Sequence, residues 1–159
     1  MLKTNITSGF FATIVISILL VAKSNVDLLP QLNLIKDLWV LLDRYTGLDL
    51  PIASAWLTHF FIGTVVWGIL YNQISGFIPG CSSVKGMFYG IIIWLVMMVA
   101  FMPAVGAGLF ASRLGANAIL MTLELNILYG IILVMTSNRS YSCASNNNCG
   151  SHNPNCSIK

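Results

Sequence analysis

The stretch that decides the fold is Ala55-Trp56-Leu57-Thr58-His59-Phe60-Phe61-Ile62-Gly63-Thr64-Val65-Val66-Trp67-Gly68. It belongs to a long apolar segment that begins after Pro51, and it contains one ionisable ring, that of His59. Ala55, His59 and Gly63 recur every four residues, so they share one face of a helix. Small residues mark the faces on which membrane helices approach closely. We therefore expect His59 to face protein rather than lipid.

Composition places the chain among membrane proteins. Of its 159 residues, 57% are hydrophobic and 8% are charged, and the mean hydropathy is +0.82. A membrane-spanning helix needs about 20 apolar residues, and four segments reach that length, at about 8–29, 52–71, 86–110 and 118–137. We predict an all-α fold in which residues 1–137 form one four-helix bundle in the lipid bilayer. The formal net charge of +3 is too small to indicate nucleic-acid binding.

The first apolar segment has two interpretations. A short basic start and the run from Gly9 to Ala22 fit a signal peptide, with Ala22-Lys23-Ser24 as a poor cleavage site. The apolar character resumes after Lys23 and continues to Pro30, which favours a retained span. We predict a retained transmembrane helix.

Residues 31–50 are too polar to span a membrane, yet they carry a helical pattern. One side of the predicted helix, at about 31–45, is apolar and consists of Leu34, Ile35, Leu38, Leu41, Leu42 and Tyr45. Such a helix either lies on the membrane surface, with Trp39 as an interfacial anchor, or docks over the end of the bundle or a partner subunit. The pattern favours neither arrangement.

Proline and glycine shape the remaining spans. Pro103 removes a backbone donor, so we expect a kink near residues 99–103. Small residues at four-residue spacing, such as Ala104 and Gly108, indicate tight helix packing. The glycines that we expect at helix contacts are Gly63, Gly68, Gly86, Gly90, Gly108 and Gly130.

The second and fourth spans resemble each other after a shift of 67 residues. His59 then lies over Asn126, and Gly63 lies over Gly130. The first and third spans show a weaker similarity, at Gly9-Phe10-Phe11 and Gly86-Met87-Phe88. This pattern predicts two helical hairpins in the same orientation, as a parallel internal repeat.

Several motifs carry a family resemblance: Thr58 to Gly68, the stretch from Met98 to Phe110, Met121-Thr122-Leu123, and Tyr129-Gly130. Together they resemble a family of small four-span bacterial inner-membrane proteins of unknown function, distantly similar to the YagU-type proteins. The resemblance covers about residues 5–137 and implies a fold without an activity. It also implies a histidine where this chain has Asn126, so a two-histidine ligand pair does not carry over.

The polar tail, residues 138–159, contains possible ligands for a metal. Its Asn/Ser-rich composition is typical of disorder, but Cys143, Cys149, His152 and Cys156 could supply four tetrahedral ligands for zinc. The spacing matches no common zinc finger. With Cys81, two disulfides are the alternative if this side of the membrane is oxidising.

Counting basic residues does not orient the chain. Four lie on the side of the termini (Lys3, Lys85, Arg139, Lys159) and four toward the other (Lys23, Lys36, Arg44, Arg113). Acidic residues gather on the second side, which favours termini in the cytoplasm, whereas the cysteine-rich tail favours the opposite. We expect cytoplasmic termini.

Depth in the membrane predicts one polar cluster. Lys23, His59 and Glu124 reach similar depths when each is counted along its span, and Asn126 lies close to Glu124 in sequence. A Lys–Glu pair beside a neutral imidazole would remove much of the cost of an isolated charge in lipid. The alternative is that Lys23 extends outward toward Asp27 and leaves Glu124 protonated or paired across a subunit interface.

Three functional classes follow, and none is an enzyme, because no nucleophile–base set or phosphate loop is present. We expect an accessory or assembly subunit of a larger membrane complex, in contact with other subunits or with itself. The alternatives are an oligomeric transporter or channel that uses Lys23, His59 and Glu124, and a protein that binds haem or another redox group through His59.

Overall fold

The computed structural model describes residues 2–25, 33–78 and 81–137, and within these ranges every regular element is a helix. Four helical runs are long and apolar enough to cross a membrane: Asn5–Lys23, Ala53–Ile74, Ser82–Ala104 and Ala116–Thr136. The prediction of four candidate spans in an all-α chain is therefore confirmed. The tail at 138–159 lies outside the described residues.

The four runs consist of α-helices, two of which contain a wider π turn. The first run is α1 (Leu2–Asn25), and the last is α7 (Ala116–Thr136). The second joins α3 (Ala53–Phe61), the π turn η1 (Ile62–Val66) and α4 (Trp67–Ile74). The third joins α5 (Ser82–Val96), the π turn η2 (Met97–Phe101) and α6 (Met102–Ala104).

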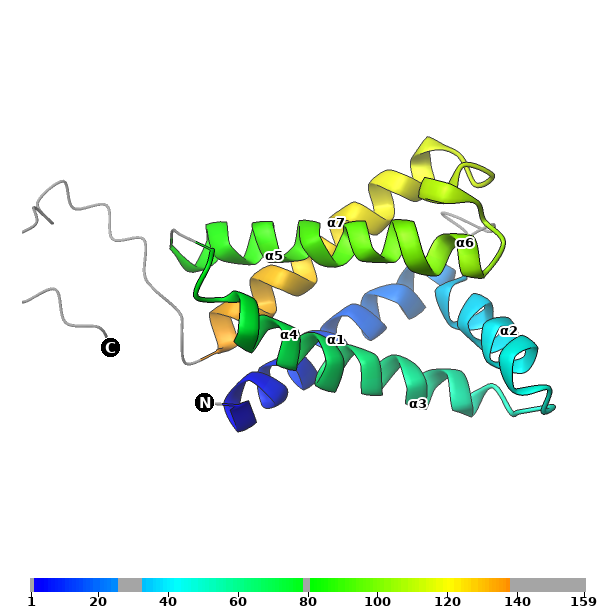
Figure 1. Ribbon diagram of the computed structural model, residues 1–159, viewed down its shortest axis with the longest axis horizontal. Coiled ribbons are helices and arrows are strands. Elements are labelled where there is room, and N and C mark those ends of the chain that lie inside the picture. The colour runs from blue at the N-terminus through cyan, green and yellow to red at the C-terminus, as the bar shows by residue number, and fades with distance from the viewer. Residues whose placement is uncertain (1, 26–32, 79–80, 138–159) are drawn as a thin grey trace, which may run out of the picture.

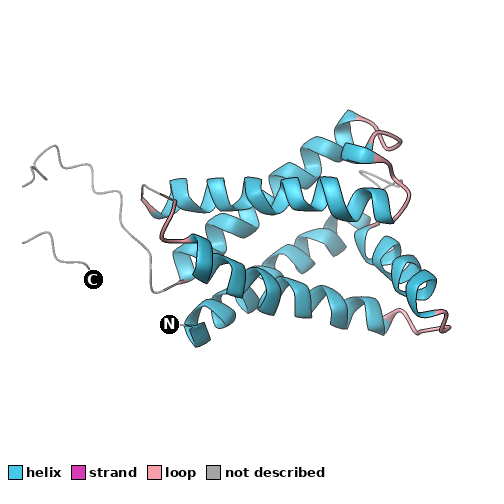
Figure 2. Ribbon diagram, viewed as in Figure 1, coloured by secondary structure: helices cyan, strands magenta, loops and turns pink. Residues whose placement is uncertain are grey.

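The runs alternate in direction, as Figures 1 and 2 show. The start of α1, the end of α4, the start of α5 and the end of α7 lie at one end of the molecule, and α2, α6 and the start of α7 lie at the other. The most extensive packing joins α5 to α7, while α1 packs against η1, α4 and α7. Toward the second end α3 diverges from α1.

Helix α2 (Leu34–Thr46) has clear start and stop signals. The Asn33 side chain accepts a hydrogen bond from the Lys36 amide, and Gly47 ends the helix in the left-handed conformation, with φ of 64°. Ile35 and Leu38 are buried against Ala55 of α3. The Trp39 indole donates to the Leu50 carbonyl at 2.6 Å. Part of the apolar side of α2 thus packs against the bundle's own α3.

The third run ends earlier than the sequence predicts, at Ala104 rather than near residue 110. Gly106 and Gly108 adopt positive φ values of 84° and 82°, which a continuing helix cannot contain. The expectation that Gly108 packs within a helix is therefore wrong. A short 3-10 turn, η3 (Leu109–Ala111), and Gly115 then lead into α7.

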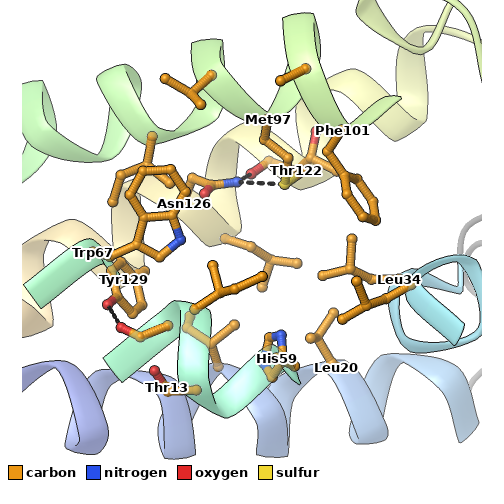
Figure 3. A pocket seen from close by; sticks show the side chains of 18 residues that line it. Thr13, Leu20, Leu34, His59, Trp67, Met97, Phe101, Thr122, Asn126 and Tyr129 are labelled. Carbon is orange, nitrogen blue, oxygen red and sulfur yellow. Dashed lines mark hydrogen bonds between the residues drawn. The ribbon is translucent and has the colours of Figure 1, made fainter. Parts of the chain in front are cut away.

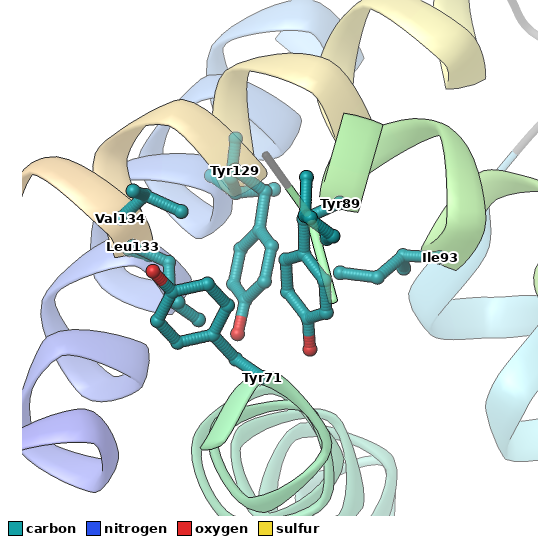
Figure 4. Close-up of a cluster of buried hydrophobic side chains, with 9 residues drawn as sticks. Tyr71, Tyr89, Ile93, Tyr129, Leu133 and Val134 are labelled. Atoms are coloured by element: carbon teal, nitrogen blue, oxygen red, sulfur yellow. The ribbon is translucent and has the colours of Figure 1, made fainter. Parts of the chain in front are cut away.

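Three tyrosines form the centre of the main core (Figure 4). Tyr71 of α4 and Tyr89 of α5 are fully buried, and their rings meet edge to face with centroids 5.1 Å apart. Tyr129 of α7 lies beside them, together with Leu133 and Val134. These rings join the second, third and fourth runs.

Candidate functional site

A cavity of about 270 Å³ lies between the helical runs (Figure 3). Its walls come from α1, α3 with η1 and Trp67, α5 with η2, and α7, and Leu34 and Leu38 of α2 line one end of it. Most of the lining is aliphatic or aromatic. The polar or partly polar side chains among the lining residues are Thr13, His59, Trp67, Thr122, Asn126 and Tyr129. Such a mixture is typical of small-molecule sites.

The π turn η1 shapes one wall. The Trp67 amide, which in an α-helix would bond the Gly63 carbonyl, bonds the Ile62 carbonyl instead. The Tyr129 hydroxyl donates to the Gly63 carbonyl from α7, and the Tyr89 hydroxyl donates to the Trp67 carbonyl. Two tyrosines from the neighbouring runs thus hold the backbone at this irregular segment.

The π turn η2 shapes the opposite wall. The Met102 amide bonds the Met97 carbonyl, five residues back, just before Pro103. Since proline has no amide hydrogen, the backbone pattern is already interrupted at this point. Met97, Ala100 and Phe101 of this turn line the cavity. The irregular backbone lies at residues 97–101, close to the kink that Pro103 predicts.

His59 faces the cavity from α3 (Figure 3). Its Nε2 atom lies 3.3 Å from the Ser17 hydroxyl of α1, and its ring meets Trp56 and Phe60 edge to face or nearly so. The prediction that His59 faces protein is consistent with this placement. Neither Lys23 nor Glu124 contacts it.

Asn126 faces the cavity from α7. Its amide nitrogen donates to the Thr122 carbonyl at 2.7 Å and lies 3.9 Å from the Met97 sulfur. The Thr122 hydroxyl accepts from the Trp94 indole at 3.3 Å. These bonds fix the orientation of the amide, so that its oxygen is left for another partner.

Lys23 and Glu124 meet on the outside of the bundle. The Lys23 Nζ atom lies 3.4 Å from Glu124 Oε2 and 3.2 Å from the Met121 sulfur. The side chains are 30% and 70% exposed, and neither lines the cavity. The four residues expected in one polar cluster therefore separate into an outer ion pair and two cavity residues. Glu124 and Asn126 are two positions apart on α7, so they point to nearly opposite sides.

Five of the six expected packing glycines lie where helices touch. A side chain on Gly86 would meet the Ile131 backbone at 2.5 Å, and one on Gly90 or Gly130 would meet the facing backbone of the α5–α7 pair. Gly63 lies against the Thr13 side chain. A Cβ atom placed on Gly68 would lie 3.1 Å from the Asn5 carbonyl oxygen. These contacts join runs within one chain.

The residues that sequence reasoning missed are Trp67, Tyr89 and Tyr129. They were not expected at the site because aromatic residues in apolar spans are common. Their hydroxyl and indole groups matter only because the π turns and the helix crossings bring them to the cavity and its wall. The available signal was that Tyr129 immediately precedes Gly130, the residue that matches Gly63 in the repeat.

The predicted zinc ligands at Cys143, Cys149, His152 and Cys156 lie outside the described residues. Within residues 2–25, 33–78 and 81–137, no group of three metal-ligating side chains occurs. Cys81, at the start of α5, is disulfide-bonded.

The described fold is a four-run membrane bundle, and a known family matches residues 2–146. The chain belongs to the DUF6789 family. This is a family of unknown function, so membership identifies no activity for the DUF6789 protein. No curated protein and no solved structure matches it. The uncharacterised-family prediction is confirmed, while the likeness to YagU-type proteins stays a prediction.

Proposed function

We propose that this DUF6789 protein is a non-enzymatic accessory or assembly subunit of a larger membrane complex. The observation that carries the proposal is the Lys23–Glu124 ion pair on the outer surface of the single chain. Charged side chains within membrane spans almost always face protein or a water-filled cavity. A partner helix against this surface would give the pair such an environment.

The position of Glu124 along its helix supports this argument. It lies eight residues after Ala116, which corresponds to about 12 Å along the axis of α7. The Glu124 side chain is 70% exposed at this depth, although Lys23 supplies an opposite charge beside it. A neighbouring subunit or a second copy that covers Leu120 and Glu124 would remove these two side chains from lipid.

The low burial of the second run is a further support. Only 17% of its apolar stretch in Ala53–Ile74 is buried within the chain, against 39% for Asn5–Lys23. Its exposed residues Leu57 and Phe61 are suited to lipid or to a partner helix. The transporter alternative has less support, because it requires Lys23, His59 and Glu124 along one path.

The proposal includes a location and an orientation. We place the protein in the bacterial inner membrane with cytoplasmic termini, and we place α2 at the opposite membrane surface. Ile35 and Leu38 of α2 pack against Ala55 of α3. Burial raises the pKa of the Asp37 carboxyl, and the nearby Lys36 charge opposes this shift.

The two hairpins pack in the same way. Gly9 meets the backbone of Gly63 and Thr64, as Gly86 meets that of Gly130 and Ile131.

Site-specific photo-cross-linking in native membranes tests the subunit role. A photoreactive residue at Leu120 lies one helical turn before Glu124 and is 63% exposed. The matched control is Phe88, an exposed residue of α5. We expect a protein adduct of defined mass from Leu120, and we expect Glu124→Gln to weaken it.

Absence of a protein adduct at Leu120, or equal adducts at Leu120 and Phe88, would contradict the proposed interface. An adduct of twice the chain mass would identify the neighbour as a second copy of this chain. A heavier adduct that co-purifies on a native gel would identify another subunit.

A further inference from the structure

The cavity between the helical runs contains hydrogen-bonding groups that the described part of the chain leaves without partners. The Trp67 indole N–H has no acceptor there, and the Asn126 amide oxygen has no donor. The His59 ring uses only its Nε2 atom, toward Ser17. Figure 3 shows all three side chains directed to the same space.

Unused groups of this kind indicate a polar ligand atom or water. Polar groups away from bulk water normally have hydrogen-bond partners, and leaving one without a partner costs free energy. Trp67 supplies a donor, Asn126 supplies an acceptor, and His59 supplies either one according to its tautomer. A hydroxyl group satisfies both requirements, because it donates one hydrogen bond and accepts others.

The rest of the described lining favours an uncharged ligand. Among the described residues that line the cavity, none is Asp, Glu, Lys or Arg, and apart from the six polar or partly polar side chains named above the lining is apolar. An ion would lose its hydration there without a counter-charge. The ligand is therefore uncharged and soluble in lipid.

Aromatic side chains in the lining indicate which kind of uncharged ligand fits. Trp67, Tyr129 and Phe101 line the same cavity, and aromatic rings pack well against one another. The volume of about 270 Å³ lies at the small end of ligand pockets, so it suits a ring with its substituents while an attached chain extends between the helices. We propose that the cavity binds the head of an uncharged lipid that carries a hydroxyl-bearing ring, of the phenol or quinol type.

A pair of matched probes tests this site. 4-Decylphenol has the ring, the hydroxyl and an apolar chain, whereas decylbenzene lacks only the hydroxyl. We expect saturable binding of decylphenol to the full chain in lipid nanodiscs, measured by calorimetry, and an increase in thermal midpoint. Decylbenzene should bind at least about fivefold more weakly, since the loss of one or two hydrogen bonds has about that effect.

Variants separate the cavity from general partition into lipid. Trp67→Phe removes the indole donor, and Asn126→Leu removes the amide, so each should weaken decylphenol binding about fivefold. Trp56→Phe is the control, because Trp56 is an indole of the same run that does not line the cavity. The thermal midpoint of each variant without probe shows whether it is folded.

Two results would overturn the proposal. One is non-saturable uptake of decylphenol by the wild-type chain, which is the behaviour of lipid partition or of a water-filled cavity. The other is equal affinity for the two probes, which would show an apolar cavity that does not use its polar groups. Neither result bears on cross-linking at Leu120, so the subunit role is tested independently.

Discussion

Lys23 of α1 and Glu124 of α7 are 101 residues apart in the sequence, and their charged groups meet 3.4 Å apart on the outer surface of the bundle. The pair joins the last turns of the first run to the first half of the fourth. Because it faces away from the cavity, it contributes to the outer surface rather than to a polar interior.

Loss of one partner of this ion pair should lower the thermal stability more than loss of both. Glu124→Gln leaves the Lys23 charge alone at membrane depth, so we expect the thermal midpoint in nanodiscs to fall by about 2–4 °C, which corresponds to about 1 kcal/mol for a chain of this size. Lys23→Met combined with Glu124→Leu should recover much of that loss. A double variant no more stable than Glu124→Gln alone would refute the pairing.

The close approach of the Gly63 backbone to the Thr13 side chain should leave no room for a side chain at position 63. In Gly63→Ala the new Cβ would lie 2.9 Å from Thr13 Cγ2, so we expect a loss of about 1–3 kcal/mol in unfolding free energy. Thr13→Ala removes the crowding atoms and leaves the Thr13 Cβ 3.3 Å away, so it should partly rescue the variant.

Gly76→Ala is the control for that experiment, because no atom lies within 4 Å of the Cβ that it adds. Its unfolding in a mild detergent should match that of the wild-type chain. If Gly63→Ala and Gly76→Ala behave alike, the close approach of α1 and η1 is not as the structure has it.

The hydroxyl of Tyr129 should stabilise the π turn. Tyr129→Phe keeps the ring but leaves the Gly63 carbonyl without its side-chain donor, which should cost about 1–3 kcal/mol. Tyr45→Phe is the matched control, since Tyr45 is 77% exposed on α2. Chemical unfolding followed by near-ultraviolet circular dichroism measures both, and equal stabilities would show that the tyrosine bond contributes nothing.

The two ends of the bundle should label from opposite sides of the membrane. Leu48 follows α2 and Phe77 follows α4, and both side chains are exposed. With cysteine placed at each position in turn, an impermeant thiol reagent should reach only one of the two in intact cells. Permeabilised cells provide the control, because both positions should then react. Equal labelling in intact cells would contradict the four-span topology.

Much of the architecture follows from the sequence. Four stretches of about 20 apolar residues are enough to predict four spans, because a helix must be that long to satisfy its backbone across a bilayer. Apolar residues at helical spacing likewise predict α2, and the observed helix, Leu34–Thr46, lies close to the expected range. The prediction failed at residues 105–110, where apolar residues continue although the helix ends at Ala104.

The composition of the candidate site could not be predicted, because the sequence does not show which side of each helix faces which neighbour. Counting residues along a span predicts depth, and depth alone placed Lys23, His59 and Glu124 together. Which side of a helix faces a given neighbour depends on the crossing of all four runs, and a π turn such as η1 shifts the register of every later side chain.

Sequence by itself thus determined the number of candidate spans and the presence of a helix near residues 34–46, because these depend on the local pattern of apolar residues. Only the tertiary structure decided that Glu124 faces outward beside Lys23, that Asn126 and His59 share a cavity, and that Tyr129 reaches the Gly63 carbonyl. The physical reason is that these relationships join residues from different helices, and they are decided by how closely small residues such as Gly86 and Gly130 let those helices approach.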